Sequence, residues 1–416
     1  MRKLPFSNSQ IKELVSKHKT PFYIYDERGI TAFSEDLQNA FSWVNGFGYK
    51  NYFAVKALPN PNIVKLLYDL GMGVDTSSMA ELVIAERLGI RGEDIMFTAN
   101  NVPIEEFEKA RALGAIINFD DITHLDFYYK HFDSMPETVC FRYNPGALKE
   151  GNEIIGNPLE AKYGLTKEQL FEAYASAKEY GAKRFGLHTM IVSNMLDVAY
   201  HQDTAKILFE LAVELKNRLD IDLEFVNLGG GLGIPYKPDE KPVDLEVLSR
   251  SIQREYERVV VPHNLSFSVV TEYGRAITGP YGYLVTAVLH TMQKYKKYIG
   301  VDASMSNLMR PALYGAYHHI VVLEKDNNEP TETCDVVGSL CENNDKFAID
   351  RLLPKIKTGD ILVICDVGAH GHAMGFQYNG KLRSAEFLLT KNGEFKQIRR
   401  AETLDDYFAT VNLLNK

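Results

Sequence analysis

The sequence predicts a (β/α)8 barrel joined to a second, antiparallel β domain. Eight short apolar runs, rich in β-branched and aromatic residues, alternate with longer helical patterns between residues 52 and 272, as in a parallel sheet built from βα units. After Gly282 the pattern changes to long strand-like segments with hairpin turns. The chain of 416 residues has room for a barrel of about 250 residues and a smaller domain.

The barrel strands are expected where the apolar runs lie, at residues 52–55, 73–76, 95–98, 115–119, 138–143, 184–190, 224–228 and 266–272. Helices are expected between them, including residues 78–88, 103–113, 167–180, 204–219 and 245–260. Glycines 89, 114 and 181 directly follow three of these helices, as is typical of helix ends.

These elements place the barrel at residues 28–276 and the antiparallel β domain at residues 1–27 and 277–416. We expect the apolar segment Tyr23-Ile24-Tyr25 to join the β domain. Near the C-terminus, Asn392-Gly393 between two strand-like runs predicts a hairpin closed by a type I′ turn. The long irregular stretch 144–161 follows the fifth barrel strand, and such stretches are often lids or binding loops.

The composition is that of a water-soluble protein with a packed core. Hydrophobic residues make up 45% of the chain and the formal net charge is −9, which disfavours a polyanionic partner such as nucleic acid. The N-terminus lacks the apolar run of a secretion signal, and no stretch approaches the roughly 18 apolar residues that cross a bilayer. We therefore expect a cytoplasmic protein without membrane or nucleic-acid partners.

The four cysteines, Cys140, Cys334, Cys341 and Cys365, show no CxxC pairing. This pattern predicts reduced thiols rather than a disulfide framework, and it indicates no metal site.

Chemically active residue types recur at the C-terminal ends of the predicted strands, where barrel enzymes place their catalytic groups. Most of the 46 lysines and arginines are expected on solvated faces, yet Lys56 ends the first strand where a turn begins, a position that suits imine formation. The other strand ends carry Asp75, Arg142, the segment from His188 to Ser193, the glycines Gly229, Gly230 and Gly231, and then Glu272 and Arg275. A purely structural barrel has no need of such residues at so many ends.

The glycine run after the seventh strand predicts a phosphate-binding loop. Its N–H groups allow close approach of a phosphate, which barrel enzymes often bind after strands seven and eight, although a flexible turn alone also explains glycines. An imine-forming lysine beside a phosphate site indicates pyridoxal 5′-phosphate (PLP). Glu272 is then the acidic partner of the PLP ring nitrogen. The alternative for Glu272 is an ion pair with Arg275.

Five ordered motifs make the chain resemble the alanine-racemase-like, barrel-type PLP decarboxylases, and among them the diaminopimelate decarboxylase branch. The motifs are Tyr52-Phe-Ala-Val-Lys-Ala, Leu228-Gly-Gly-Gly-Leu-Gly, Glu272-Tyr-Gly-Arg, Met309-Arg-Pro-Ala-Leu-Tyr and Gly338-Ser-Leu-Cys-Glu, with Lys381-Leu-Arg-Ser-Ala-Glu near the end. The resemblance implies that Lys56 carries the cofactor as a Schiff base and that Glu272 pairs with its ring nitrogen. It also implies that Ser193, Arg275 and the three glycines surround the phosphate and substrate, with Arg142 close to the ring.

The resemblance further implies an active site shared between two subunits. The family's proton donor is a cysteine of the neighbouring subunit, which matches Cys341, followed by Glu342 at the substrate; a free buried cysteine is the alternative. An obligate homodimer is therefore expected. Arg310 and Tyr314 match the substrate-binding arginine and tyrosine, and a guanidinium suits the distal carboxylate of diaminopimelate. The implied reaction converts meso-2,6-diaminopimelate to L-lysine, the last step of lysine biosynthesis.

Two positions depart from the family pattern. Met190 stands where the family stacks a histidine on the cofactor ring, and His188, on the same side of the strand, is expected to compensate. His370 stands where the family has a tyrosine, and an imidazole there still suits contact with phosphate or substrate. Two alternatives stay open: a decarboxylase of another basic amino acid or of a carboxylated polyamine, and a catalytically silent PLP-binding regulatory protein.

Overall fold

The computed structural model describes residues 3–44, 48–152, 154, 156–325 and 330–412. The chain divides into two compact units. The barrel unit is made of Thr31–Pro235 and Lys241–Ala276, and the β unit is made of Met1–Ile30, Tyr236–Glu240 and Ile277–Lys416.

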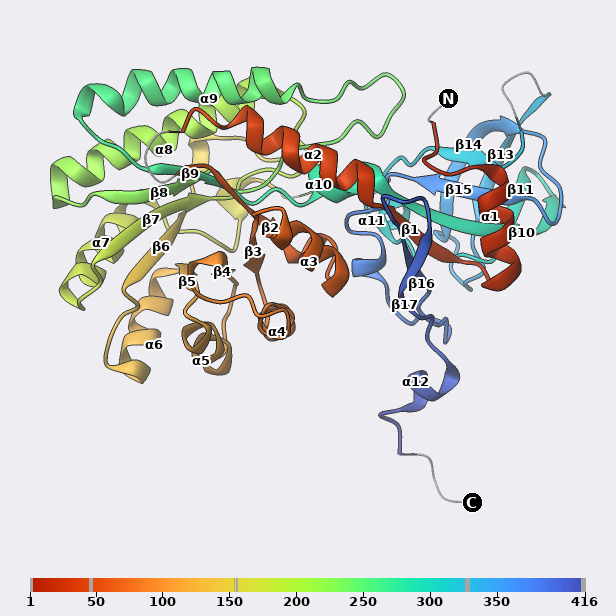
Figure 1. Ribbon diagram of the computed structural model, residues 1–416, viewed down its shortest axis with the longest axis horizontal. Coiled ribbons are helices and arrows are strands. Elements are labelled where there is room, and N and C mark those ends of the chain that lie inside the picture. The colour runs from red at the N-terminus through yellow and green to blue at the C-terminus, as the bar shows by residue number, and fades with distance from the viewer. Residues whose placement is uncertain (1–2, 45–47, 153, 155, 326–329, 413–416) are drawn as a thin grey trace. The chain divides into compact units, whose positions relative to one another are not determined.

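The barrel unit is a closed ring of eight parallel strands with helices outside it (Figure 1). The strands are β2 (Lys50–Ala54), β3 (Gly73–Thr76), β4 (Ile95–Thr98), β5 (Ile116–Phe119), β6 (Thr138–Tyr143), β7 (Arg184–Thr189), β8 (Leu223–Asn227) and β9 (Ser268–Thr271). Neighbouring strands pair in chain order, and β2 closes the ring by pairing with β9. The predicted barrel is confirmed, with each strand within a few residues of its apolar run.

The helices of this part of the chain are α2 (Glu27–Ala40), α3 (Pro61–Asp69), α4 (Met79–Arg87), α5 (Ile104–Leu113), α6 (Ile122–Phe132), α7 (Lys167–Glu179), α8 (Val198–Leu219) and α9 (Leu245–Val259). Thr166 and Gln169 form a capping box that starts α7. Helix α8 begins at Val198 rather than at the expected residue 204, because the Asp197 side chain caps it by accepting from the Ala199 N–H. Strands β3 to β6 are buried at every residue, as expected for parallel strands covered by helices.

The β unit is built on a nine-stranded sheet. Its strands are β1 (Phe22–Asp26), β10 (Gly282–Gln293), β11 (Lys297–Val301), β12 (Ile320–Val322), β13 (Thr331–Val337), β14 (Lys346–Pro354), β15 (Ile361–Cys365), β16 (Ala385–Leu389) and β17 (Phe395–Arg399). As expected for residues 23–25, β1 lies in this sheet, antiparallel to β10 and parallel to β16. Because β11 and β13 are also parallel, the sheet is mixed rather than purely antiparallel. The remaining helices are α1 (Asn8–Lys17), α10 (Arg275–Thr278), α11 (Arg310–Tyr314) and α12 (Leu404–Phe408).

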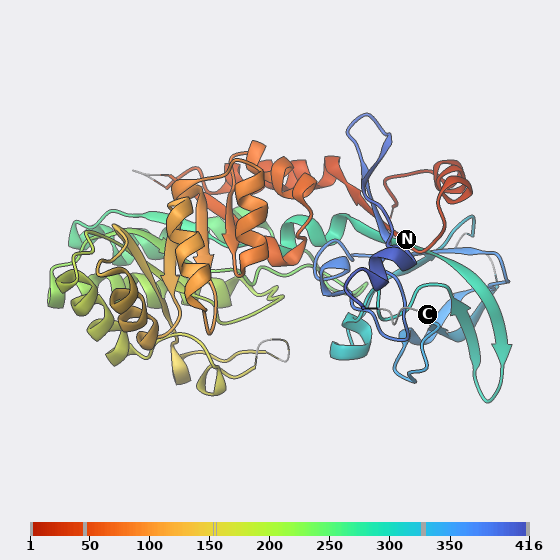
Figure 2. The ribbon, with the colours of Figure 1, turned by 90° about the horizontal axis from the view of Figure 1, so that it is seen from below.

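Two hairpins extend this sheet. The β10–β11 hairpin is the long teal pair at one side of Figure 2, and its outer end is mostly exposed. The β16–β17 hairpin forms as predicted, but its turn is not type I′. Of Asn392 and Gly393 only Gly393 has a positive φ, +84°, and its N–H donates to the Thr390 carbonyl at 2.8 Å. A type I′ turn needs positive φ at both central residues, so Gly393 instead closes a longer loop in the left-handed conformation.

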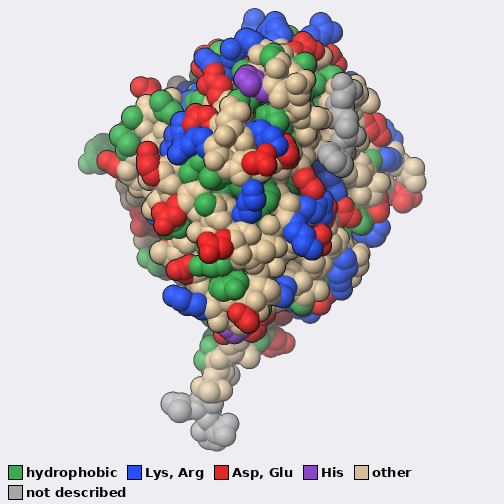
Figure 3. Space-filling model, turned by 90° about the vertical axis from the view of Figure 1, so that its left-hand side faces the viewer, with side chains coloured by type: hydrophobic (Ala, Val, Ile, Leu, Met, Phe, Trp, Pro, Cys, Tyr) green, Lys and Arg blue, Asp and Glu red, His purple; other side chains and the backbone are tan. Residues whose placement is uncertain are grey.

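The surface drawn in Figure 3 carries basic and acidic side chains intermixed rather than a field of one sign. Among the residues that the structure describes, no helix combines the length and the apolar character needed to cross a membrane.

Candidate active site

The C-terminal ends of the barrel strands bring Lys56 into the electrostatic environment of two buried acids. Lys56 lies in a single 3-10 turn (Val55–Ala57) directly after β2, and its side chain is exposed although both neighbours in the turn are buried. Its positive charge favours the ionised forms of Asp75, on β3, and of Glu272, which follows β9.

Glu272 is the centre of a buried hydrogen-bond network. Its Oε2 lies 3.1 Å from Nε2 of His188, and its Oε1 accepts from Nδ2 of Asn227 at 2.8 Å. The other ring nitrogen of His188 lies 2.7 Å from Nδ2 of Asn118. All four side chains are buried, so the carboxylate is positioned by protein groups from β5, β7 and β8.

The two buried acids have opposite protonation preferences. Burial raises the pKa of Asp75 well above its usual value, and the charge of nearby Glu272 raises it further. Burial acts on Glu272 too, but the adjacent His188, the charge of Lys56 and the bond from Asn227 hold its pKa below the ordinary value. Neighbouring carboxyl groups ionise one at a time, so Glu272 is the more acidic of the two and takes the negative charge before Asp75 as pH rises.

The glycine run after β8 is required by the close packing of the loops at these strand ends. Gly229 and Gly231 have φ values of +70° and +94°, which residues with side chains rarely adopt. A Cβ at Gly229 would lie 2.0 Å from the carbonyl oxygen of Thr189. The N–H of Gly230 donates to Sδ of Met190 at 3.3 Å, so the methionine packs directly on the glycine loop.

Ser193 and Arg275 meet beside this loop. Nη2 of Arg275, a largely buried side chain, donates to Oγ of Ser193 at 3.2 Å. Asn152 extends from the loop after β6 and donates from Nδ2 to the Ser193 carbonyl at 2.5 Å. A guanidinium and a hydroxyl at one point are groups that suit an anionic ligand such as phosphate.

Arg142 is held from three sides at the end of β6. Its Nη1 lies 3.0 Å from Oδ1 of Asp120, and its Nη2 donates to the Met190 carbonyl at 3.3 Å. The ring of Tyr163 covers the guanidinium, with 4.0 Å between the arginine Cζ and the ring centroid. The arginine therefore has a fixed orientation next to Met190.

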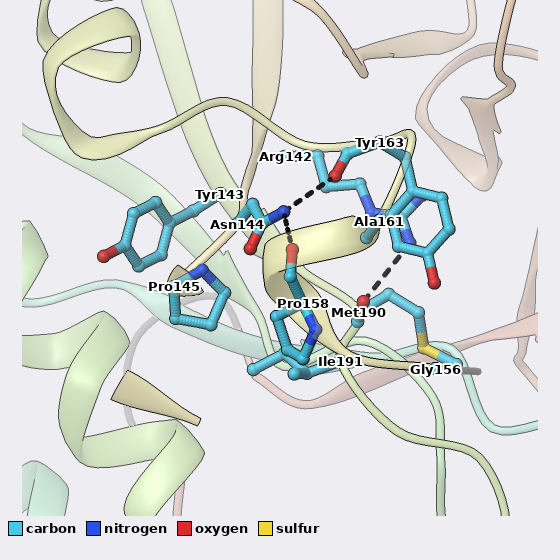
Figure 4. Close-up of a pocket in the computed structure, with 10 residues that line it drawn as sticks. All are labelled: Arg142, Tyr143, Asn144, Pro145, Gly156, Pro158, Ala161, Tyr163, Met190 and Ile191. Carbon is cyan, nitrogen blue, oxygen red and sulfur yellow. Dashed lines mark hydrogen bonds between the residues drawn. The ribbon is translucent and has the colours of Figure 1, made fainter. Parts of the chain in front are cut away.

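A pocket lies between the ends of β6 and β7 and the loop that follows β6 (Figure 4). It is lined by Arg142, Tyr143, Asn144, Pro145, Gly156, Pro158, Ala161, Tyr163, Met190 and Ile191. Asn144 ties the loop to itself by donating to the carbonyls of Pro158, at 2.9 Å, and Tyr163, at 3.3 Å. Two of the predicted cofactor residues thus border a cavity, although residues 153 and 155 of the predicted loop lie outside the described residues.

The other five predicted site residues belong to the β unit. Arg310, at the start of α11, is only 2% exposed; its Nη1 lies 3.0 Å from Nε2 of His318, and its guanidinium lies 4.6 Å from the ring centroid of Tyr236. Nδ1 of His318 in turn donates to the Cys365 carbonyl at 2.9 Å. Tyr314, at the end of the same short helix, is 40% exposed.

Cys341, Glu342 and His370 lie on connections of the β unit. Cys341, between β13 and β14, is exposed, and its N–H donates to Oδ1 of Asn379 at 2.8 Å. Glu342 is half-buried, with Oε1 accepting from the Asn344 N–H at 3.0 Å. His370 is half-buried and has a left-handed φ of +54°.

Sequence reasoning missed the two asparagines of the Glu272 network and the two partners of Arg142. Asn118 gave a signal, because a lone amide inside the otherwise apolar strand Ile116–Phe119 needs a buried hydrogen-bond partner. Asn227 directly precedes the glycine motif Leu228-Gly-Gly-Gly, but no pattern in the sequence indicates its role. Asp120 and Tyr163 reach Arg142 only through the folded loop, and no local pattern indicates them.

Comparison with known proteins identifies the relatives of this chain. The model of the family described as pyridoxal-dependent decarboxylase, pyridoxal binding domain, matches residues 33–279. The chain is 43% identical over 401 residues to Protein TabA of Pseudomonas amygdali pv. tabaci, covering 96% of this chain and 93% of TabA. It is 34% identical over 406 residues to the diaminopimelate decarboxylase of Methanothermobacter thermautotrophicus, covering 96% and 94%.

A solved structure of the diaminopimelate decarboxylase of M. jannaschii, in complex with L-lysine, superposes with a TM-score of 0.88 at 32% identity. The match covers 97% of this chain and 94% of that protein, so it includes both units.

Proposed function

This chain belongs to the pyridoxal-dependent decarboxylases and is a PLP-dependent carboxy-lyase of the diaminopimelate decarboxylase type, and we propose that it converts meso-2,6-diaminopimelate to L-lysine and carbon dioxide. The observation that carries the proposal is the pairing of an exposed Lys56 with a buried, ionised Glu272 in one electrostatic cluster. A lysine amine that binds the cofactor and a carboxylate beside the ring nitrogen are the two groups that suit PLP in a decarboxylase, where the protonated ring acts as the electron sink.

The residues at the barrel strand ends fit this cofactor. Lys56 is the residue that would hold PLP covalently through Nζ, and Glu272 would face the pyridine nitrogen. The low pKa of Glu272 suits that role, because a carboxylate, unlike a neutral acid, keeps the ring nitrogen protonated. Asp75 supports the fit, because its buried Oδ1 lacks a hydrogen-bond partner among the described residues and so suits a polar ligand group.

The phosphate end of the cofactor would lie at the loops after β7, β8 and β9. Oγ of Ser193 and the guanidinium of Arg275 are the side-chain donors there, and the glycine run leaves room for a ligand to approach the backbone closely. Arg142 and Met190 would border the ring. We propose that Met190 covers one ring face through its thioether, as the family histidine does, and that His370 contacts phosphate or substrate.

Bound PLP supplies an electron sink for the pair left behind by the departing carboxyl group. The protein must then orient the substrate, hold the ring nitrogen protonated and return a proton to the carbon. Glu272 performs the second task through its ionised carboxylate. We assign the third to the thiol of Cys341, whose exposure leaves it accessible to a second subunit.

The substrate assignment rests on Arg310. Diaminopimelate carries a carboxylate at its far end, and a guanidinium held rigidly by His318 and Tyr236 suits bidentate binding of that group. Tyr314 and Glu342 are the proposed neighbours of the substrate in the same unit. The M. jannaschii relative that was solved with L-lysine supports an L-lysine-shaped site in this type of enzyme.

A homodimer follows from the assignment of Cys341 to the opposite subunit's site. Helix α11 packs beside β14, and these two elements expose Leu313 (52%), Tyr314 (40%), Ile349 (60%) and Leu352 (63%). Such neighbouring apolar side chains suit burial in a subunit interface, and Cys341 lies on the connection that leads into β14.

Replacing Arg310 with lysine is expected to lower kcat/KM for meso-diaminopimelate by about 10- to 100-fold, because a charge-assisted, bidentate contact worth about 1.5–3 kcal/mol is lost. Activity on amino acids without a distal carboxylate should not fall. Arg399→Lys is the matched control, because Arg399 pairs with Glu386 in the same unit and has no proposed substrate role. An equal loss on all substrates would indicate a structural role for Arg310 instead.

The similarity to TabA, which carries a different name, makes a decarboxylase of another basic amino acid or of a carboxylated polyamine the second candidate. Carbon dioxide release from a panel of these substrates separates the two functions. A silent PLP-binding protein would bind the cofactor and release no carbon dioxide from any of them.

A further inference from the structure

His188 is buried in the barrel between two protein groups, and both of its ring nitrogens are engaged. Nδ1 lies 2.7 Å from Nδ2 of Asn118, and Nε2 lies 3.1 Å from Oε2 of Glu272. The side chain is 0% exposed. The sequence places His188 on the same side of the strand as Met190 and so predicts that it helps to cover the cofactor ring. These contacts indicate a different role.

The neighbours of His188 determine where its proton lies. The Asn118 amide donates one hydrogen to Nδ1 and the other to Oγ1 of Thr98, at 3.1 Å. Nδ1 is then the acceptor of the ring, and the ring hydrogen is on Nε2, facing the carboxylate of Glu272. A buried carboxylate that accepts a hydrogen bond is stabilised in its ionised form.

Other titratable groups also surround Glu272. Asp75 and Cys140 are buried, and the charge of Glu272 raises the pKa of both, so neither favours a second negative charge beside it. Lys56 favours the carboxylate, but its amine is the group that we assign to the cofactor and the substrate exchange. The hydrogen bond from His188 is one of the interactions that hold the pKa of Glu272 below its ordinary value.

We propose that His188 is a positioning residue that keeps Glu272 ionised and aimed at the PLP ring nitrogen by donating the hydrogen on Nε2, with Asn118 fixing the tautomer. This inference rests on the role proposed above for Glu272. In this arrangement Asn118 on β5, His188 on β7 and Glu272 after β9 form one hydrogen-bonded chain, in which Asn118 orients His188 and His188 orients Glu272.

The direct readout is the nitrogen NMR spectrum of the full-length, PLP-loaded protein with labelled histidine. The His188 signals are identified by their loss in His188→Gln. Nδ1 should resonate as an unprotonated acceptor and Nε2 as protonated, and the pair should change in Glu272→Gln. An unprotonated Nε2 would overturn the proposal, whatever the activity of the enzyme.

The functional readout is the PLP dissociation constant as a function of pH. In His188→Leu, which lacks the donor, the pKa of Glu272 rises, so the carboxylate is lost as pH falls through a higher value. We expect the acidic limb of PLP binding to move upward by about one pH unit, so that PLP binds about 10-fold more weakly on that limb, the scale of one charge-assisted hydrogen bond. Near neutral pH, where the carboxylate stays ionised, the affinity should change much less. His188→Gln retains an amide donor near the position of Nε2 and should lie closer to the unmodified protein.

His201→Gln is the matched control, because His201 is a buried barrel-unit histidine whose Nε2 contacts only the Met195 carbonyl, at 3.3 Å, in the described structure. The His201→Gln variant should leave unchanged both the affinity for PLP and the acidic limb of its pH dependence. If the acidic limb of PLP binding were unchanged in His188→Leu but changed in Glu272→Gln, the inference for His188 alone would be overturned. Unchanged PLP binding in Glu272→Gln would instead overturn the role proposed for Glu272.

Discussion

Replacing Lys56 with alanine is expected to lower kcat by at least about 10³-fold, the scale of loss when a covalent catalytic group is removed. The reason is its place: Lys56 is exposed in the turn after β2, while its charge acts on the two buried acids at the neighbouring strand ends. The variant should still fold and retain some PLP through the phosphate donors, but borohydride should no longer fix the cofactor to the chain.

Lys50→Ala is the matched control, because Lys50 lies at the opposite end of the same strand and pairs with Asp94. It should keep nearly full activity and normal borohydride trapping. If Lys56→Ala kept most of its activity, or if borohydride still attached PLP to it, Lys56 would not be the cofactor-bearing residue.

Mixing Lys56→Ala with Cys341→Ala is expected to restore activity that neither variant has alone. Loss of Cys341, the proposed proton donor, should lower kcat by about 10²- to 10⁴-fold. When the two chains exchange subunits, half of the dimers contain one site with both the lysine and the cysteine intact, so activity should recover to about a quarter of the unmodified level.

Cys334→Ala is the control for the thiol, because Cys334 is buried in β13, where burial raises its pKa to about 11. The Cys334→Ala variant should be active by itself. Mixing it with Lys56→Ala should give no more activity than the fraction of sites whose lysine comes from the Cys334→Ala chain. Failure of Lys56→Ala and Cys341→Ala to complement, despite demonstrated subunit exchange, would show that both groups act within one chain.

Much of the barrel could be predicted from the sequence because its signals are local. Each buried parallel strand is a short apolar run, and the residues that follow it, such as Lys56 and Glu272, are evident directly from the sequence. The start of α8 was misplaced because Asp197 caps a first turn that lacks a clear apolar pattern. The prediction of a type I′ turn at Asn392-Gly393 is wrong because this residue pair is compatible with more than one loop length.

The parts of the site that could not be predicted depend on contacts between strands. His188 was expected beside Met190 because of strand alternation, whereas its hydrogen bonds come from β5 and from the end of β9. The stacking of Tyr163 on Arg142 requires the folded loop after β6, and its sequence is irregular. Contacts of this kind join residues far apart in the chain, so the hydrophobic periodicity of the sequence does not indicate them.

The most direct test of the proposed reaction is the release of carbon dioxide by the PLP-loaded protein from meso-diaminopimelate, measured beside ornithine, arginine, lysine and a carboxylated polyamine, with Lys56→Ala as the blank. We expect carbon dioxide and L-lysine to form in equal amounts from meso-diaminopimelate, with far lower rates on the other substrates and none in the blank. Efficient turnover of another member of the panel with none of meso-diaminopimelate, or no turnover of any substrate, would contradict the proposal.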